Sequence, residues 1–218
     1  MNTSNIDNSP HEAIASLIPS TELKVVRITN FLPTHERDKL YEAICNAEEY
    51  FKGTRLHGKQ IGATSFLPMK SAGKYGMHAN PPGEAAYPLA NRIMEQIPSL
   101  CKKLEVETFE IADIDLTFIN GLNGHSGNPH TDSGYQPYHI SLIYYFHKVP
   151  KVFSGGKLQF YAFDVQAKDG HSEQSLFEIE PADNTLIAFP SETFHGITTV
   201  KSDSTNFSDG RFIAVGFV

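Results

Sequence analysis

The chain has 218 residues, of which 40% are hydrophobic and 20% charged, a composition typical of one packed globular domain. Its formal net charge of −7 argues against a surface that binds nucleic-acid phosphates, and no stretch reaches the roughly 18 apolar residues of a membrane span. We therefore expect no nucleic-acid or membrane partner. The polar start of the chain lacks the apolar core of a secretory signal, so we expect a cytoplasmic protein.

The first part of the chain predicts an arm followed by a strand and a helix. Residues 1–22 are rich in Ser, Asn and Pro, and we expect a flexible N-terminal arm with a short helical turn at 11–18. Residues 23–218 are predicted to form a single domain. It begins with a strand at 23–28 and continues with a helix at 34–51, where a Thr suited to capping precedes apolar residues at helical spacing.

The next segment is irregular and is followed by a second helix. Residues 53–83 contain six glycines and three prolines, which predicts a binding loop or lid. The helix is expected at 88–104, so that residues 34–104 form a helical support for the rest of the domain. Cys45 and Cys101 lie in these helical stretches and are interpreted as buried, reduced thiols.

From residue 111 to the end, the pattern changes to short apolar or alternating runs. The predicted strands cover residues 111–119, 140–146, 157–163, 176–179, 185–189, 195–200 and 212–218. Several short strands separated by turn residues are typical of a β-sandwich or barrel. The sequence therefore predicts helices first and a β core at 111–218.

The triplet His130-Thr131-Asp132 is the strongest candidate for chemistry. A His and an Asp two positions apart on a strand project from the same face, because side chains alternate along a strand. His195 lies in a later strand-like run and supplies a third donor. Two imidazoles and one carboxylate suit ferrous iron and leave the opposite face of an octahedron open. We therefore predict that His130, Asp132 and His195 are catalytic metal ligands.

Arg211 is the second candidate, sixteen residues after His195 (211 − 195) and at the start of another apolar run. Its neighbours Phe212 and Ile213 make an exposed position unfavourable. A buried guanidinium there would hold one carboxylate of a dicarboxylic co-substrate through two hydrogen bonds. The sequence therefore predicts that Arg211 binds a co-substrate anion.

With these pieces in order, the chain resembles the prolyl 4-hydroxylase-like branch of the Fe(II)/2-oxoglutarate-dependent dioxygenases. The resemblance covers residues 23–218 in outline and is specific from Asp115 onward. The matching segments are residues 130–132 (HTD), 154–158 (SGGKL), 184–191 (NTLIAFPS), 194–196 (FHG) and 210–212 (GRF).

This resemblance implies a mainly β fold with flanking helices, namely a double-stranded β-helix (jelly roll) similar in shape to the cupins. It implies Fe(II), 2-oxoglutarate and O2 as cofactors and co-substrates, and it admits ascorbate as a reductant. The implied reaction hydroxylates an unactivated C–H bond of a small molecule, an amino acid or a prolyl or peptidyl substrate, with release of succinate and CO2. Related halogenases carry a small residue where this chain has Asp132, so hydroxylation or another oxidation is favoured over chlorination.

Two departures from the family pattern concern the co-substrate pocket. Many members place a Ser two residues after the basic residue, where this chain has Ile213. Members often use a Tyr on the strand before the His-x-Asp motif, where the nearest candidates in this chain are Asn120 and Phe118. We retain Asn120 as a co-substrate residue and expect Tyr144 or Tyr138 to replace the missing phenol. The Gly-Gly turn at 155–156 is interpreted as structural, because glycine permits a tight turn.

Two other function classes stay open at this point. One is a catalytically silent or regulatory jelly roll that binds a metal and senses oxygen or a metabolite. The other is a cupin-like enzyme that holds Zn or Mn without 2-oxoglutarate. His125 and His139 flank the motif and are interpreted as packing residues, with a role behind the metal ligands as the alternative.

Overall fold

The computed structural model describes residues 13–17, 23–56, 59–66, 69–70, 78–79, 83–107, 114, 116–133 and 139–218. The helices in these ranges are α1 (Thr34–Cys45) and α2 (Tyr87–Leu104), with short 3-10 turns at Glu48–Tyr50, Gly83–Ala86 and Phe207–Asp209. The strands are β1 (Ile14–Leu17), β2 (Val26–Thr29), β3 (Lys52–Leu56), β4 (Lys59–Phe66), β5 (Met69–Lys70), β6 (His78–Ala79), β7 (Leu116–Gly121), β8 (Gly127–His130), β9 (Ile140–Tyr145), β10 (Leu158–Phe160), β11 (Phe177–Ile179), β12 (Thr185–Pro190), β13 (His195–Ile197) and β14 (Arg211–Phe217).

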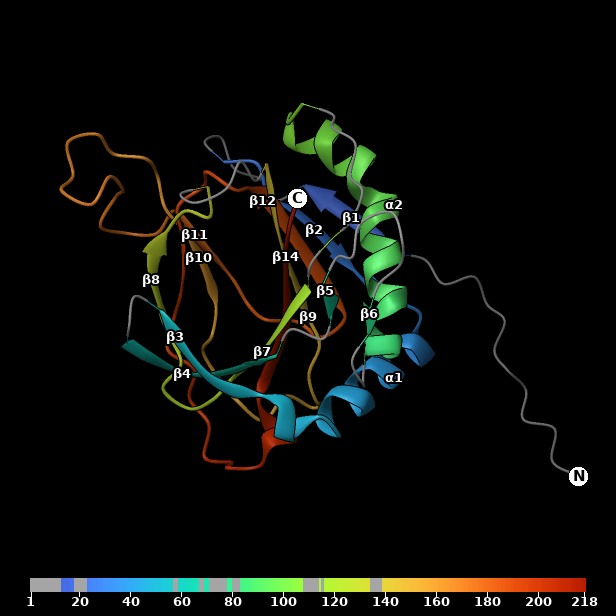
Figure 1. The fold of residues 1–218 in the computed structure, drawn as a ribbon. Helices are drawn as coiled ribbons and strands as arrows, with labels where there is room; N and C mark the ends of the chain where they lie inside the picture. The colour runs from blue at the N-terminus through green and yellow to red at the C-terminus, as the bar shows by residue number, and fades with distance from the viewer. Residues whose placement is uncertain are drawn as a thin grey trace, which may run out of the picture.

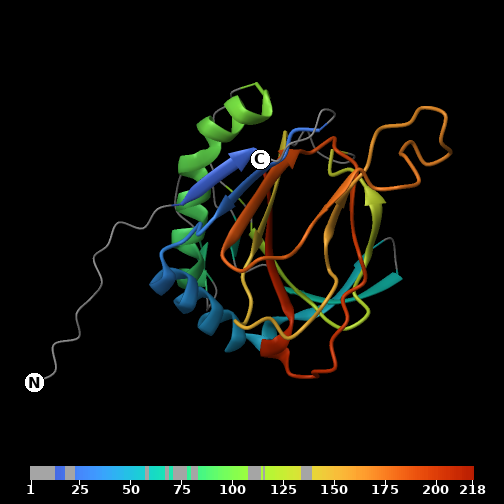
Figure 2. The same ribbon diagram turned by 180° about the vertical axis from the view of Figure 1, so that it is seen from behind.

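Most of the described strands form two facing sheets, and β5 pairs with β6 in a separate two-stranded sheet. The major sheet has eight strands in the order β1-β2-β12-β9-β14-β7-β4-β3, and the minor sheet has four in the order β11-β10-β13-β8. Figure 1 shows the minor sheet on one side of the major sheet and both helices on the other, and Figure 2 shows the same layers from behind. The predicted fold class, a mainly β jelly roll with flanking helices, is confirmed.

Each face of the major sheet is covered by a separate apolar core. One core lies between this sheet and the helices and includes Leu142 and Tyr144 of β9. The second includes Ile143 and Tyr145 of the same strand together with Leu158 of the minor sheet, so it lies between the two sheets. The alternation arises because successive side chains of a strand point to opposite faces. A strand buried on both sides is expected to be mostly apolar, and all six residues of β9 are buried, with Ser141 as the polar exception.

Helix α2 covers the outer face of the major sheet through one apolar stripe. Its buried residues recur every three or four positions, as expected for a helix that packs on one side: Leu89, Ile93, Ile97, Leu100 and Leu104. The helix begins within one residue of the predicted position and continues through Pro98. Cys101 is buried in α2, Cys45 is half-buried in α1, and both are free thiols. In the described part of the chain, no helix is long and apolar enough to cross a membrane.

Three segments differ from the sequence prediction, and one of them is the helix expected at 34–51, which ends at Cys45. Residues 14–17, which belong to the predicted arm, form β1 and pair with β2, with Ile14 opposite Thr29. Residues 53–83 contain β4, β5, β6 and most of β3, of which β4 joins the major sheet beside β7. Glycine weakens the local signal for a strand, whereas pairing with a preformed edge satisfies the backbone hydrogen bonds. Residues 1–12 and the rest of the predicted lid lie outside the described residues.

Candidate metal centre

The three residues predicted as metal ligands converge at one end of the minor sheet. His130 ends β8 and is the register partner of His195, the first residue of β13. Asp132 lies two residues beyond β8, where its backbone N–H donates to the Ser191 carbonyl at 2.9 Å. The His130 Nε2 atom lies 3.7 Å from Asp132 Oδ1, and the His195 Nε2 atom lies 3.5 Å from Asp132 Oδ2. One donor atom from each residue falls within 4.8 Å of the others.

Backbone carbonyls orient both imidazoles toward this centre. His130 Nδ1 lies 2.8 Å from the Asn128 carbonyl oxygen, and His195 Nδ1 lies 3.0 Å from the Thr193 carbonyl oxygen. A carbonyl accepts only, so each Nδ1 carries the proton and each Nε2 keeps its lone pair. This second hydrogen bond is the usual companion of a metal-ligating histidine, because it fixes both the tautomer and the ring orientation.

The donors differ in their exposure to solvent. The His130 side chain is 35% exposed, compared with 14% for Asp132 and 6% for His195. Burial lowers the pKa of His195 to about 4, the neighbouring His130 also lowers it, and Asp132 acts in the opposite direction. His195 is therefore neutral at neutral pH, which is the form that binds a metal ion. A set of two neutral imidazoles and one carboxylate fits ferrous iron.

Arg211 lies at the start of β14 in the major sheet, and its side chain is fully buried. Its Nη2 donates a long hydrogen bond of 3.4 Å to the Tyr145 hydroxyl, and the Tyr145 ring centroid lies 5.2 Å from the guanidinium carbon. Its Nε and Nη1 atoms have no hydrogen-bond partner among the described residues. Burial of a charge with unsatisfied donors is unfavourable unless an anion binds them. The residues present therefore fit the carboxylate end of a 2-oxo diacid.

His125 is a neighbour of Arg211 that the sequence interpretation placed among packing residues. It is buried, and its Nδ1 has no partner among the described residues. That atom lies 2.6 Å from the point where a side chain on Gly121 would begin, and Gly121 is the register partner of Arg211. Burial lowers the pKa of His125 to about 4, and the charge of Arg211 lowers it too. Its place in the loop before His130 is the only sequence signal that pointed to the site.

Two residues predicted to bind the co-substrate lie on the other face of the major sheet, which corrects the sequence prediction. The Tyr144 hydroxyl donates to Asn184 Oδ1 at 2.9 Å, in the core under the helices. Asn120 donates from Nδ2 to the Phe207 carbonyl at 2.9 Å and pairs with Phe212, whose side chain belongs to that same core. Tyr145, one residue further along β9, points to the inner face beside Arg211. Tyr138 lies outside the described residues.

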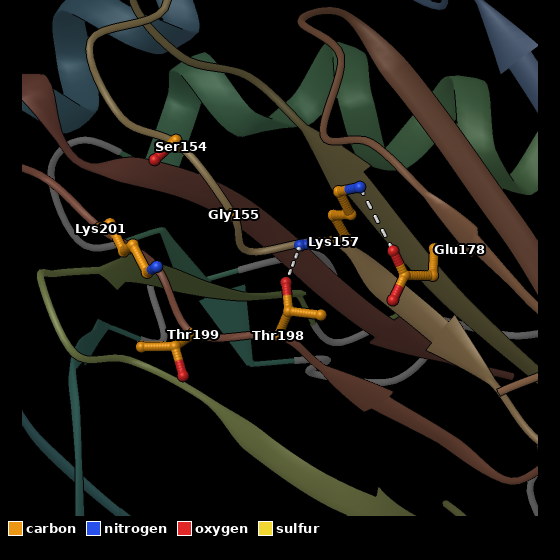
Figure 3. Close-up of a pocket in the computed structure, with 7 residues that line it drawn as sticks. All are labelled: Ser154, Gly155, Lys157, Glu178, Thr198, Thr199 and Lys201. Carbon is orange, nitrogen blue, oxygen red and sulfur yellow. Dashed lines mark hydrogen bonds and ion pairs between the residues drawn. The ribbon is translucent and has the colours of Figure 1, made fainter. Parts of the chain in front are cut away.

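A separate hollow of about 400 Å³ lies near the Gly-Gly turn of the minor sheet. It is lined by Ser154, Gly155, Lys157, Glu178, Thr198, Thr199 and Lys201. Figure 3 shows the Lys157 side chain directed at Glu178, an ion pair of 3.3 Å, and the Lys157 backbone N–H donating to Thr198 Oγ1 at 2.9 Å. The lining includes neither the three metal-site residues nor Arg211, so the hollow is distinct from the centre.

Comparison with known proteins shows what this chain is similar to. Residues 116–218 match the family model described as the 2OG-Fe(II) oxygenase superfamily, a range that contains the three converging residues and Arg211. An uncharacterized PKHD-type hydroxylase from Synechocystis sp. is 29% identical over 196 residues, which cover 88% of this chain and 61% of the relative. The chain therefore spans about three-fifths of the length of that curated relative.

Solved structures with a similar fold include two prolyl hydroxylases. A prolyl-4-hydroxylase from Pseudomonas putida is 16% identical, with a TM-score of 0.58 and coverage of 90% of this chain and 92% of that one. A prolyl hydroxylase from Trichoplax adhaerens, in complex with a peptide fragment of the hypoxia inducible factor, is 14% identical, with a TM-score of 0.61 and coverage of 88% and 82%. At these identities the likeness establishes the fold, and the predicted resemblance is confirmed at that level.

Proposed function

We propose that the protein is an Fe(II)- and 2-oxoglutarate-dependent hydroxylase, because residues 116–218 match the family model of the 2OG-Fe(II) oxygenase superfamily. One observation carries the proposal. Three donor atoms converge from the minor sheet and from the residues just beyond β8. A fully buried guanidinium, two of whose donors have no partner among the described residues, lies in the sheet that faces them. A protein that only stored a metal ion would have no use for that buried positive charge.

The metal would be held by Nε2 of His130, Nε2 of His195 and the carboxylate of Asp132. When bound together with 2-oxoglutarate and O2, Fe(II) supplies the oxidation of an unactivated C–H bond as 2-oxoglutarate becomes succinate and CO2. The role of the protein would be to occupy three neighbouring coordination positions of the ion with one carboxylate and two neutral imidazoles. Asp132 fills the position that a small residue would leave to chloride, which favours hydroxylation.

The distal carboxylate of 2-oxoglutarate would bind Arg211. Two hydrogen bonds from a planar guanidinium to a carboxylate fix the orientation of the diacid as well as its position. The Tyr145 hydroxyl, 3.4 Å from Arg211 Nη2, holds the guanidinium on the inner face of the major sheet. Both groups are buried, which strengthens the attraction because little water competes for the charge.

We assign an amino-acid side chain, free or within a peptide, as the substrate class, with another small molecule as the alternative. The support is the shared fold with two proteins described as prolyl hydroxylases, one of them in complex with a peptide. Ascorbate as a reductant belongs to the same proposal. Succinate release measured across a panel of free amino acids and prolyl peptides would identify the class.

An anaerobic titration tests the co-substrate site directly. Protein loaded with Fe(II) is expected to develop a weak visible charge-transfer band as 2-oxoglutarate is added. In Arg211→Met the midpoint of that titration should rise roughly 10- to 100-fold, because a hydrogen bond to a charged group contributes about 1.5–3 kcal/mol. Lys102→Ala, an exposed change in the last turn of α2, is the matched control and should leave the midpoint unchanged.

The same titration separates the alternatives. Intact protein that binds Fe(II) and shows no band with 2-oxoglutarate would contradict the hydroxylase proposal and favour a metal-binding sensor or a cupin-like enzyme. An Arg211→Met protein with an unchanged midpoint would contradict the role of Arg211 alone.

A further inference from the structure

Two neighbouring strands of the major sheet change from apolar to hydroxyl side chains at the same end. Along β9, the residues on the inner face are Tyr145, Ile143 and then Ser141. Along β12, the inner residues are Ile187 and Phe189, and Ser191 follows directly after the strand. Both serines are 1% exposed. A hydroxyl buried among apolar neighbours is unfavourable unless it has a hydrogen-bond partner, so these serines need one.

Their partner is the carboxylate of the metal site. Ser141 Oγ lies 2.6 Å from Asp132 Oδ2, and Ser191 Oγ lies 2.9 Å from Ser141 Oγ. An ionised carboxylate only accepts, so the single Ser141 proton points to Asp132, and Ser191 must then donate to Ser141. The short Ser141–Asp132 distance is that of a charge-assisted hydrogen bond. The two hydroxyls therefore form a directed chain that ends on Asp132.

A third contact ties the same residues together through the backbone. The Asp132 N–H donates to the Ser191 carbonyl at 2.9 Å. Asp132 has no strand of its own to hold it, since β8 ends at His130. The contacts to Ser141 and Ser191 therefore fix this residue from two sides, its main chain and its Oδ2 atom. Within the described part of the chain, Oδ1 accepts no hydrogen bond and faces His130 Nε2.

From this arrangement we propose that Ser141, supported by Ser191, is a positioning residue that makes Asp132 bind the metal ion through one oxygen. The inference rests on the proposed function. Oδ2 also lies 3.5 Å from His195 Nε2, but its hydrogen bond from Ser141 occupies one of its lone pairs, which favours Oδ1 as the oxygen that binds the ion. One-oxygen binding keeps an extra coordination position free, which the co-substrate and O2 require. Partners behind a metal ligand typically contribute 10- to 100-fold to metal affinity.

Cobalt(II) provides a test that does not depend on activity, because its visible absorption reports coordination number and its binding can be titrated. Ser141→Ala is expected to weaken Co(II) binding about tenfold and to change the intensity of the absorption bands. Ser191→Ala should weaken it less, by about threefold, since its effect passes through Ser141. Ser141→Thr retains the hydroxyl and should recover most of the affinity and the original spectrum. Ser154→Ala, an exposed serine, is the matched control.

The outcomes are distinguishable. Equal Co(II) affinity and identical spectra in intact protein and Ser141→Ala would overturn the inference and leave the proposed function standing. Co(II) binding by intact protein that His195→Ala does not weaken would overturn the metal site itself, and the inference with it. Thermal melting of the metal-free variants checks that they fold. If Ser141→Ala does not fold, Ser191→Ala decides the question, because an unchanged affinity and spectrum there would contradict the chain of hydroxyls.

Discussion

At the residue scale, two basic groups, His125 and Arg211, approach each other beside Gly121, since atoms of both lie within 3.5 Å of the Cβ position of that glycine. Both are buried, and both have side-chain nitrogens without a partner among the described residues. The charge on Arg211 opposes a second charge on His125, and burial opposes it more strongly, which is why the pKa of His125 falls to about 4. The folded protein thus keeps His125 neutral over a pH range in which an unfolded chain would protonate it.

This difference in the pKa of His125 predicts that the free energy of unfolding has a pH-dependent contribution from this side chain. Between about pH 6.5 and pH 4 the unfolded state binds a proton at His125 that the folded state does not, so the free energy of unfolding falls as the pH is lowered. From pH 7 to pH 5 the loss attributable to this residue is about 2 kcal/mol. Urea unfolding of metal-free protein at the two pH values should show that His125→Gln loses less stability than the parent by about this amount.

His35→Gln, on the exposed side of α1, is the control and should keep the parent pH dependence. A His125→Gln protein whose stability falls as steeply as that of the parent would show that His125 is already protonated, or free to become so, in the folded state.

At the element scale, the Gly-Gly turn between β9 and β10 controls the space around Arg211. Gly155 and Gly156 both have a φ of +66°, a backbone conformation that favours glycine. A Cβ atom on Gly156 would lie 2.5 Å from Arg211 Cδ and 2.8 Å from Arg211 Nε. One on Gly155 would collide with the Thr199 carbonyl. The turn therefore needs glycine for two reasons, its own dihedral angles and the side chain of Arg211 packed against it.

Gly156→Ala should therefore impair the anion site more than it impairs the fold. The added methyl group must displace Arg211, and we expect 2-oxoglutarate affinity to fall at least about tenfold, as for partial loss of a charge-assisted hydrogen bond. Gly124→Ala is the matched control, because Gly124 also has a positive φ of 86° but no atom of the described residues lies within 4 Å of its Cβ position. Both variants should lose about 1–2 kcal/mol of stability from backbone strain.

Calorimetric titration of 2-oxoglutarate into the Mn(II)-loaded proteins gives the affinities. Equal affinities in the Gly156 and Gly124 variants would mean that Arg211 has room to move aside without loss of the site.

The sequence predicted some strands better than others, because some have a clear apolar pattern and others are interrupted by glycine. Strands such as β9 and β12 consist mostly of apolar, aromatic and β-branched residues, with Ser141 as an exception, and no competing pattern obscures them. The strands within residues 53–83 were missed, because glycines interrupt this segment and β7, with which β4 pairs, lies more than fifty residues away. The strand at 14–17 was missed for a related reason, since it depends on pairing with β2 and has weak local preference.

Site residues that are recognised by their spacing in the sequence could be predicted. Site residues whose role depends on which face of the sheet their side chain occupies could not. His130, Asp132 and His195 follow from linear motifs, and the structure brings them together. Tyr144 and Tyr145 are adjacent in the sequence, but a shift of one position along a strand changes the face on which a side chain lies. Tyr144 therefore packs under the helices and Tyr145 packs between the sheets. Without the strand register, a run of buried residues on both faces gives no sign of which tyrosine is which.

At the scale of the whole molecule, the site joins the two sheets. The metal-site histidines belong to β8 and β13 of the minor sheet, whereas Arg211 belongs to β14 of the major sheet. An ion and a diacid bound between them would connect the layers more firmly than the side-chain packing alone. Ligands that bind only the folded state stabilise it according to their concentration relative to the dissociation constant.

Binding should therefore raise the stability of the whole domain in two steps. Mn(II) at 100 times its dissociation constant is expected to add about 2.7 kcal/mol, and 2-oxoglutarate at a similar excess should add about as much again. Differential scanning calorimetry would show a single transition that moves upward with each addition, and chelation with EDTA should reverse both shifts. In Asp132→Ala the first shift should shrink or vanish. A 2-oxoglutarate shift that persists at full size without metal would contradict a site shared by the two ligands.

The unequal burial of the three metal-site residues also has a kinetic consequence. His195 and Asp132 shield their sides of the ion from water, whereas the partly open His130 ring borders the surface. Metal ions are expected to enter and leave at the exposed side of the site, next to His130. The rate at which a bulky chelator removes the metal would then depend on how often His130 dissociates from the ion. Occupancy in a metal-poor cell would then depend on the lifetime of that one bond.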